Sequence, residues 1–189
     1  MVGAFASFTA LRDEALVCTR CPLAATRNQV VFGVGDEHAD LMFVGEGPGA
    51  DEDRIGEPFV GRAGKLLTSL IEEIGLTRAD VYIANVVKCR PPGNRDPLPL
   101  EIDSCRPFLE AQLDFIRPRV VVTLGNFATK LLLDTKAGIT KLRGEVHPFR
   151  EGSVVIPVLH PSAVLRNGGA ALAQARADFV MIRRTLMAP

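Results

Sequence analysis

An apolar run of strand length leads directly into a glycine-rich loop in LMFVGEGPGADED, residues 41–53. A second glycine-rich segment, GEPFVGRAG at residues 56–64, closes the loop, and an amphipathic pattern then continues to Gly75. This order predicts a strand over 41–45, a long loop, and a helix over 61–75. Glycines let the backbone approach a ligand closely, and a helix start offers free N–H groups. We therefore expect a binding cleft here; an exposed loop with ordinary solubilising charge is the alternative.

Further apolar runs alternate with helical patterns along the chain. Strands are expected at residues 81–87, 120–125 and 154–159, with a short edge strand within 28–33. Helices are expected at residues 3–17, 100–116, 126–133 and 170–187. Near-continuous Val, Ile and Leu strands joined by helices are typical of a parallel sheet covered on both faces. The sequence predicts an α/β fold, a three-layer α/β/α sandwich with a central four-stranded parallel sheet, as a single domain over residues 1–189.

The composition is that of a globular protein, with 47% hydrophobic and 23% charged residues. Basic and acidic residues number 22 each, so nucleic-acid binding would have to come from a local basic patch rather than from net charge. No apolar run has membrane-spanning length, and the N-terminus lacks a signal-peptide pattern. We expect a cytoplasmic protein with no membrane partner, and a monomer, because the chain has no long apolar stripe.

Polar positions fall at or near the ends of all four strands: Glu46, Asn85, Asn126 and His160. In open α/β sheets, ligands bind outside the carboxyl ends of the strands, so these side chains should share one site. The alternatives are a structural hydrogen bond for Asn85 and a helix-capping or core position for His160. Basic residues in the same loops predict a rim that tracks phosphates, unless they form ordinary solvated surface. They are Lys88, Arg90, Arg95, Lys141, Arg143 and Arg166.

The four cysteines are Cys18, Cys21, Cys89 and Cys105. Their spacing lacks the second Cys-x-x-Cys of a zinc ribbon, and disulfides are rare in a reducing compartment. Four thiolates suit an iron–sulfur cluster or a structural zinc, whereas four unrelated thiols are the alternative. A shared metal would tie the N-terminal segment to the loop that follows the second strand.

These motifs together resemble the iron–sulfur uracil-DNA glycosylases known as family 4, of the thermostable type. The resemblance extends from Cys18 through the last helix. It is carried by GEGPG at 45–49, GEPFVG at 56–61, NVVKCRPP at 85–92, LG at 124–125 and HPSAVLR at 160–166, together with the four cysteines. One departure is Gly47, where relatives commonly carry alanine, a small change that should be tolerated. A related branch traps DNA covalently through a histidine in a basic insertion after the second strand, whereas the loop at residues 90–96 has no histidine. The resemblance thus implies ordinary turnover on uracil-containing DNA, single- or double-stranded.

The resemblance also implies a role for each site residue. It implies a [4Fe-4S] cluster on the four cysteines, Phe59 stacked on a flipped-out uracil, and Asn85 reading the Watson–Crick edge of that base. His160 would stabilise the charge that develops on uracil O2, and Glu46 would stabilise the sugar cation or orient water. Glu52 would exclude thymine at C5. Backbone N–H groups of Gly45 to Gly49, including Gly47, would help to hold the base.

The DNA-binding segment implied by the resemblance is a wedge loop over residues 162–166. It contains Ser162, Leu165 and Arg166, and Leu165 would be the plug that enters the duplex. Two alternatives come from other classes: a non-catalytic nucleic-acid-binding module with a structural iron–sulfur or zinc site, and a zinc-stabilised hydrolase of unrelated substrate. Iron analysis separates the two metals, and a uracil-excision assay separates enzyme from binding module.

Overall fold

The computed structural model describes residues 5–188, and six strands form one sheet in the order β1-β3-β2-β4-β6-β5. The strands are β1 (Val34–Gly35), β2 (Leu41–Gly45), β3 (Tyr82–Asn85), β4 (Val120–Leu124), β5 (His147–Pro148) and β6 (Val154–Val158). The four central strands, β3, β2, β4 and β6, are parallel, whereas the edge strands β1 and β5 are antiparallel to their neighbours.

The predicted four-stranded parallel sheet is therefore confirmed as the centre of a larger mixed sheet. The two edge strands have two residues each, too few to give a periodic signal. The expected edge strand within residues 28–33 is wrong by position, because pairing with β3 begins at Val34. The expected helix over 3–17 is observed as Phe8–Leu16, and its first two residues lie outside the described residues.

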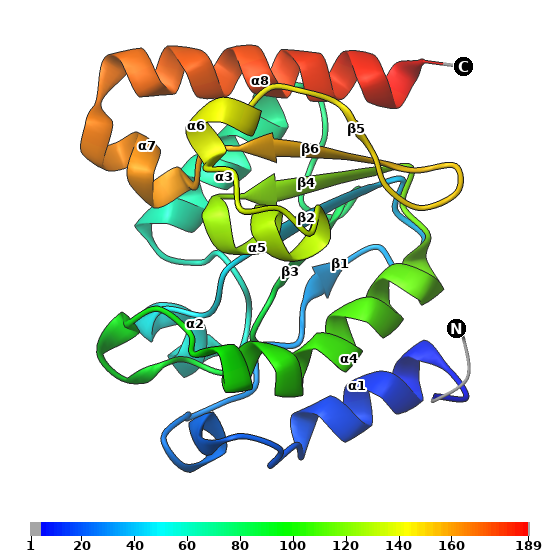
Figure 1. The fold of residues 1–189 in the computed structure, drawn as a ribbon, viewed down its shortest axis with the longest axis vertical. Coiled ribbons are helices and arrows are strands. Elements are labelled where there is room, and N and C mark those ends of the chain that lie inside the picture. The colour runs from blue at the N-terminus through cyan, green and yellow to red at the C-terminus, as the bar shows by residue number, and fades with distance from the viewer. Residues whose placement is uncertain (1–4, 189) are drawn as a thin grey trace.

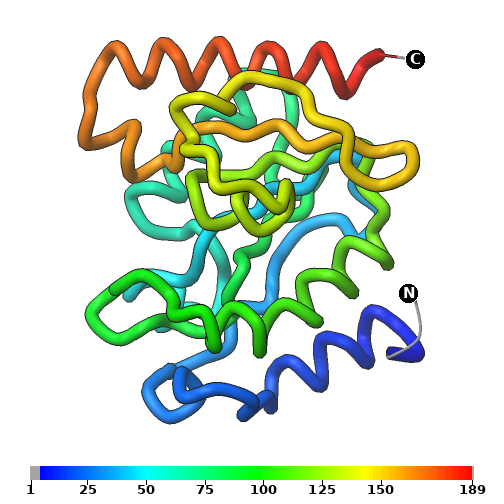
Figure 2. The backbone as a smooth tube through the Cα atoms, viewed as in Figure 1, coloured from blue at the N-terminus to red at the C-terminus, as the bar shows by residue number. Residues whose placement is uncertain are grey.

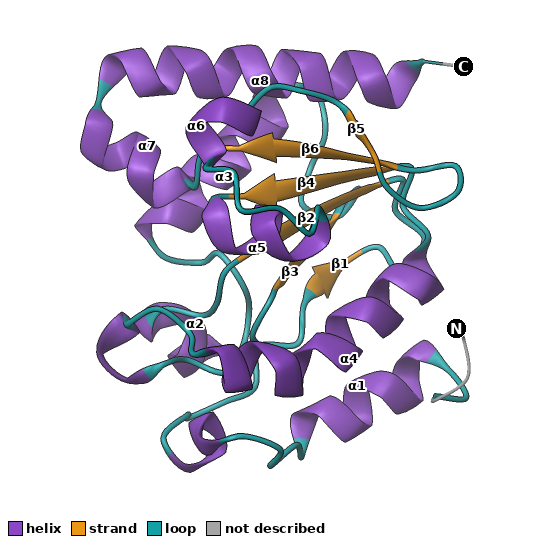
Figure 3. Cartoon of the chain, viewed as in Figure 1, coloured by secondary structure: helices purple, strands orange, loops and turns teal. Residues whose placement is uncertain are grey.

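Helices lie on both faces of the sheet (Figure 3). They are α1 (Phe8–Leu16), α2 (Ala50–Ile55), α3 (Arg62–Glu73), α4 (Pro99–Ile116), α5 (Asn126–Leu132), α6 (Ile139–Leu142), α7 (Pro161–Asn167) and α8 (Gly169–Met187). Side chains of α3, α7 and α8 bury one face of the sheet, and those of α4 and α5 bury the other. Helix α1 packs on the outer side of α4, where Leu11 and Phe108 belong to one buried cluster (Figure 2). The predicted three-layer arrangement is confirmed.

Two helices occupy segments that were expected to be loops. Helix α2 follows Gly49 and has three acidic residues in its first turn, where negative charge stabilises the exposed N–H groups. Helix α7 begins with Pro161 in its first turn, a position that proline favours, and His160 caps it. The segment 162–166 is thus helical, and the predicted wedge loop is corrected to a helix. None of the described helices is both long and apolar enough to cross a membrane.

Candidate active site

A cavity of about 580 Å³ opens at the carboxyl ends of the central strands. The arrowheads of β4 and β6 point toward α7 (Figure 1), and residues of α7 line this cavity. Most of the predicted site residues line the cavity: Glu46, Gly47, Glu52, Phe59, Asn85, His160, Ser162 and Arg166. Gly45 and Leu165 do not line it, although both are next to residues that do.

Asn85 is the last residue of β3 and stands opposite Gly45 of β2 in the register of the sheet. Its side chain is buried, with 2% of the residue exposed, and its Oδ1 atom has no hydrogen-bond partner within the described part of the chain. Buried polar atoms are almost always paired, so an unpaired acceptor in a cavity wall is suited to a ligand donor.

Gly45 makes this close arrangement sterically feasible. A Cβ atom on Gly45 would come within 2.5 Å of both Asn85 Oδ1 and Phe59 Cζ. Any side chain at this position would therefore displace the amide or the ring. Gly45 therefore packs directly against the Asn85 amide and the Phe59 ring, although it does not itself line the cavity.

Phe59 is a buried aromatic residue that adopts an unusual backbone conformation. Its φ angle is +54°, in the left-handed region that large side chains seldom occupy. The residue is 7% exposed, and its ring centroid lies 5.8 Å from that of His160, with the two planes tilted by 36°. The phenyl ring and the imidazole therefore form adjacent walls of one cavity.

His160 caps helix α7 and faces the cavity at the same time. Its Nδ1 atom accepts a hydrogen bond from the Ser162 backbone N–H at 3.2 Å and lies 2.7 Å from Ser162 Oγ. Burial lowers the pKa of His160 to about 4, with a further lowering from Arg166 and a partial offset from Glu52. The ring is therefore neutral at neutral pH. Because Nδ1 accepts a hydrogen bond, the proton is on Nε2.

Glu46 follows β2 directly and is half-buried in the cavity wall. Burial raises the pKa of Glu46 above its ordinary value of 4.5, and the negative charge of Asp96 raises it further. Its backbone carbonyl accepts a hydrogen bond from Val87 N–H at 3.0 Å, which fixes the start of the loop against the end of β3.

Glu52 lies in α2, and its carboxylate accepts hydrogen bonds from the backbone of the surrounding loops. Oε1 accepts hydrogen bonds from the N–H groups of Val60 and Gly61 at 3.0 and 2.9 Å, and Oε2 accepts one from Gly49 at 3.1 Å. Glu52 thus joins the two glycine-rich segments that the sequence places on either side of α2. Its predicted role in excluding thymine stays a prediction.

The predicted basic rim holds only in part. Lys88 is not on the surface: it is 2% exposed, and its Nζ donates to the Asn85 carbonyl and to Gln112 Oε1 at 2.8 and 2.5 Å. Arg95 is paired with Glu101, and Arg143 with Asp178. Arg166 remains exposed at the cavity, and Leu165 beside it on α7 is 43% exposed.

The four cysteines line one small cavity of about 20 Å³ between α1, the end of β3 and α4. Backbone and side-chain N–H groups point at three of the sulfur atoms. Lys88 N lies 3.2 Å from Cys105 Sγ, Arg27 Nη1 3.5 Å from Cys89 Sγ, and Arg20 N 3.5 Å from Cys18 Sγ. Among the described residues, no three His, Cys, Asp or Glu side chains are already arranged to hold a metal ion. The four sulfur atoms nevertheless converge on one cavity, and N–H donors point at three of them, which suits a group ligated by thiolates.

Asn126, which the sequence placed at the end of the third strand, lines the cavity as expected, whereas Asn94, Asp96 and Ile139 were not predicted. Asn94 and Asp96 lie in the proline-rich loop after β3, which leaves the sheet at the same end as Asn85. Their place in this loop was the only feature of the sequence that could have predicted their position in the site. Asn126 acts within the protein, since its Oδ1 accepts the backbone N–H of Ile139 at 2.8 Å.

Comparison with known proteins places this arrangement in a family. Residues 32–183 match the profile of the Uracil DNA glycosylase superfamily. The chain is 53% identical to the Type-4 uracil-DNA glycosylase of Thermotoga maritima, over 79% of each protein. It is 49% identical to that of Archaeoglobus fulgidus over 80% of each, and 46% identical to that of Sulfurisphaera tokodaii over 85% of this chain and 77% of the relative. The chain therefore belongs to the uracil DNA glycosylase superfamily.

Proposed function

We propose that the cavity binds a uracil flipped out of DNA, and that Glu46, Asn85 and His160 carry the hydrolysis of its N-glycosidic bond. The activity is that of a uracil-DNA glycosylase in DNA repair: free uracil is released and an abasic site is left. The observation that supports this site most directly is the buried, unpaired Oδ1 of Asn85 beside the Phe59 ring. A non-catalytic binding module is not favoured, since the relatives named above are glycosylases.

Asn85 would supply the choice of base. Uracil presents an N3–H donor and an O4 acceptor, which match the carbonyl and the NH₂ of a side-chain amide. Cytosine presents an acceptor at N3 and a donor at C4, so both contacts would be lost. A site that relies on buried hydrogen bonds rejects such an analogue by a factor of about 10⁴ to 10⁵. Phe59 would stack on the ring, and the N–H groups of the loop from Gly45 to Gly49 would hold the oxygens.

His160 would assist departure of the base. As the C1′–N1 bond breaks, negative charge develops on uracil and positive charge on the sugar. The Nε2–H of neutral His160 can donate to O2, and the preorganised donor needs no rearrangement because Ser162 already fixes the ring. Glu46, when ionised, can stabilise the sugar cation or orient the water whose oxygen bonds to C1′.

We propose that Cys18, Cys21, Cys89 and Cys105 hold a [4Fe-4S] cluster, with zinc as the alternative. Four thiols in one cavity, with N–H groups directed at their sulfurs, support this. When bound, the cluster would cross-link the N-terminal segment to the core; no electron transfer is needed for glycosidic hydrolysis. The residues 1–189 would then act as a single domain tied together by the cluster.

Uracil-containing DNA, single- or double-stranded, is the proposed partner, and helix α7 its proposed contact. Ser162 and Arg166 line the cavity on this helix, and the exposed Leu165 would enter the stack vacated by the base. The side chain of Arg166 would neutralise a phosphate. The DNA substrate favours an intracellular enzyme, which we place in the cytoplasm and expect to act as a monomer.

The test is excision from a labelled oligonucleotide with a single uracil, followed by alkali to break the abasic site. The parent protein should give uracil-dependent breakage with repeated turnover. His160→Ala should slow it by about 10² to 10³, the usual effect of removing an oxyanion donor. Asn85→Ala should also slow it strongly and should narrow the preference for uracil over cytosine.

His38→Ala is the matched control, because His38 is exposed and distant from the cavity. It should leave the rate unchanged. An iron-loaded, folded parent that breaks no uracil strand would remove the enzymatic function. Excision that survives both site substitutions would remove the residue assignments alone, and a denaturation-resistant protein–DNA adduct would contradict turnover.

A further inference from the structure

Arg78 lies in the turn before β3 and does not line the active-site cavity. Its half-buried guanidinium nevertheless reaches the backbone of Phe59, a residue that does line the cavity. Nη2 donates to the Pro58 carbonyl at 2.8 Å, and Nη1 donates to the Phe59 carbonyl at 3.2 Å. Nη1 also lies 3.3 Å from Thr68 Oγ1 on α3. One side chain thus holds two successive carbonyl groups and a neighbouring helix.

The N–H groups of the same short segment are held from the other end by Glu52. Its Oε1 accepts the N–H groups of Val60 and Gly61. The four residues from Pro58 to Gly61 are therefore fixed by a cation at their carbonyl groups and an anion at their N–H groups. Hydrogen bonds to charged partners are roughly twice as strong as neutral ones.

This segment needs such support because Phe59 sits at a φ of +54°. A left-handed conformation at a non-glycine residue is unfavourable and persists only where its surroundings fix it. Helix α3 contributes to this, since a Cβ atom on Gly64 would lie 1.9 Å from the Phe59 carbonyl oxygen. Helix α3 therefore lies directly against the Phe59 backbone at Gly64.

We propose that Arg78 is the positioning residue for Phe59: it holds the Pro58–Phe59 carbonyl groups so that the phenyl ring stays in place to stack on the flipped base. This inference rests on the proposed role of Phe59 in the pocket. Arg78 touches neither the base nor the reacting atoms, so its contribution passes through the aromatic ring.

The shape of the guanidinium matters for this role. Its planar fork can donate to two carbonyl groups at once, whereas a lysine ammonium is a single point of charge on a flexible stem. Arg78→Lys should therefore keep the charge but recover only part of the function. Arg78→Met keeps the length of the side chain and removes every donor.

The experiment measures kcat, KM and inhibition by free uracil for the parent, Arg78→Met and Arg78→Lys. Free uracil is the probe because it reports on base stacking without a contribution from DNA. Loss of an aromatic stacking partner weakens binding by about 10- to 100-fold. We expect Arg78→Met to weaken uracil inhibition by up to this amount and Arg78→Lys by less.

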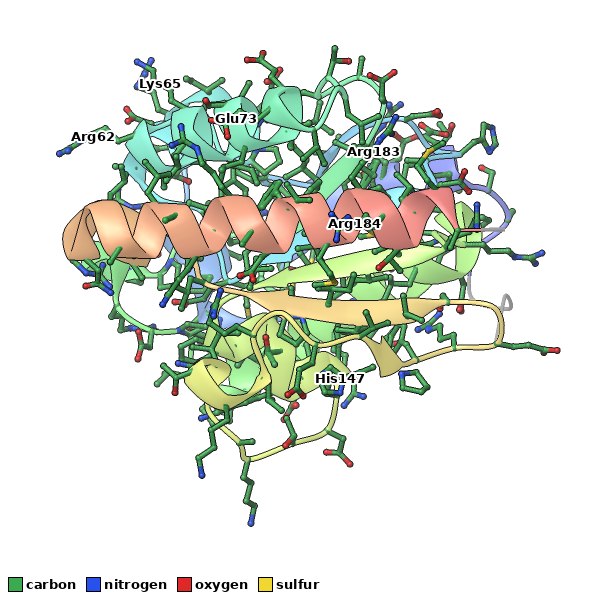
Figure 4. All side chains as sticks on the ribbon, turned by 90° about the horizontal axis from the view of Figure 1, so that it is seen from above. Arg62, Lys65, Glu73, His147, Arg183 and Arg184 are labelled. Carbon is green, nitrogen blue, oxygen red and sulfur yellow. The ribbon has the colours of Figure 1, made fainter. Side chains whose placement is uncertain are left out.

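Arg176→Met is the matched control. Arg176 on α8 makes two hydrogen bonds to Glu73 of α3, and Figure 4 shows Glu73 beside α8. This exposed pair also links a distant arginine to α3 but contacts no part of the Pro58–Gly61 segment. Its loss should leave uracil inhibition and kcat unchanged, even if the melting temperature falls slightly.

A double-mutant cycle with Phe59→Ala decides whether Arg78 acts through the ring. If it does, Arg78→Met should cause no further loss of uracil inhibition in the Phe59→Ala background. Losses that multiply would show that Arg78 acts elsewhere, and an unchanged Arg78→Met enzyme would also overturn the inference. Should Arg78→Met not fold, the same cycle is run with Arg78→Lys. A parent that excises no uracil would instead refute the proposed function itself.

Discussion

His160 shows how one imidazole ring can support the fold and the chemistry together. Its Nδ1 atom is committed to the first turn of α7, so only Nε2 is free to meet a ligand. The helix-capping interpretation of His160 is therefore confirmed, and it is compatible with the catalytic role, which stays a prediction. Because burial holds the pKa of His160 near 4, the ring is uncharged at neutral pH and still offers its Nε2–H as a hydrogen-bond donor.

We predict that the loss of kcat/KM in acid comes from protonation of Glu46 and not of His160. His160 has a pKa of about 4, so it stays neutral as the pH falls through 6.5 and gains its proton only in stronger acid. Glu46 has a pKa raised above 4.5, so its protonation should come first and remove the ionised carboxylate. Activity should therefore be lost on the acid side through Glu46. The measurement is the pH profile of kcat/KM on a uracil oligonucleotide.

Asp96→Asn identifies the group behind this acid limb. Asp96 adds to the raised pKa of Glu46, so its neutralisation should shift the limb to lower pH. An acid limb that stays in place in Asp96→Asn, or one centred near 6.5 that disappears in a His160 variant, would contradict the assignment.

Sequence patterns find single polar residues at strand ends, but they do not show which charged residues are buried. Lys88 follows Asn85 closely and was grouped with the surface arginines. In the structure, its ammonium is buried and donates a hydrogen bond to the backbone carbonyl of Asn85. Gln112, eighty residues from Phe32 in the chain, completes that buried network. Partners this distant in sequence leave no local pattern, and the contact of Arg78 with Phe59 was missed for the same reason.

At the scale of elements, the long regular segments and the seven-residue helix α5 could be predicted, whereas helices α2 and α7 could not. The strand at Leu41–Gly45 has the predicted bounds, because four apolar residues and a glycine define it. Helices α2 and α7 have six and seven residues and bury few apolar side chains, so no hydrophobic period appears in them. Their capping residues were present in the sequence: an acidic first turn in α2, and a proline after His160 in α7.

Helix α3 carries a prediction of its own, since it can approach Phe59 only through a glycine. We predict that Gly64→Ala slows uracil excision by at least 10-fold. The new Cβ would lie 1.9 Å from the Phe59 carbonyl oxygen and would force the Phe59 backbone away from the helix. Helix propensity acts in the opposite direction, since alanine favours a helix interior over glycine by about 1 kcal/mol. Excision kinetics and thermal melting together separate the two effects.

Gly169→Ala is the matched substitution for this test. Gly169 is the first residue of α8, and an added Cβ would meet nothing within 4 Å. It should leave excision unchanged and stability equal or slightly higher. Equal activity of Gly64→Ala and Gly169→Ala would show that the contact between α3 and Phe59 has no catalytic importance.

At the scale of the whole molecule, the cysteine cavity joins parts of the chain that the sheet does not hold. Cys18 and Cys21 follow α1, Cys89 follows β3, and Cys105 lies in α4. Helix α1 packs on α4 and meets the sheet through Phe8, whose ring centroid lies 5.7 Å from that of Tyr82 in β3. The spacing of the cysteines alone could not distinguish a cluster from four unrelated thiols. Only the folded structure brings all four cysteines to one cavity.

We predict that Cys105→Ser loses bound iron and destabilises the protein by several kcal/mol, comparable to the ~2–5 kcal/mol lost with a native disulfide in a small domain. The reason is that the serine hydroxyl is a poor substitute for a thiolate ligand, and an incomplete set of ligands would no longer tie α1 and its following loop to the core. Iron content, thermal melting and limited proteolysis of the purified variant measure the effect.

Asp103→Ser in the same helix is the control for the substitution itself, because Asp103 is exposed and does not line the cysteine cavity. It should retain iron and stability. In Cys105→Ser, proteolysis should begin in the segment before β1, since the proposed cluster would attach that segment through Cys18 and Cys21. A stable, fully active, iron-free Cys105→Ser protein would mean that packing of α1 on α4 suffices, and that the four thiols are not the link between the N-terminal segment and the pocket.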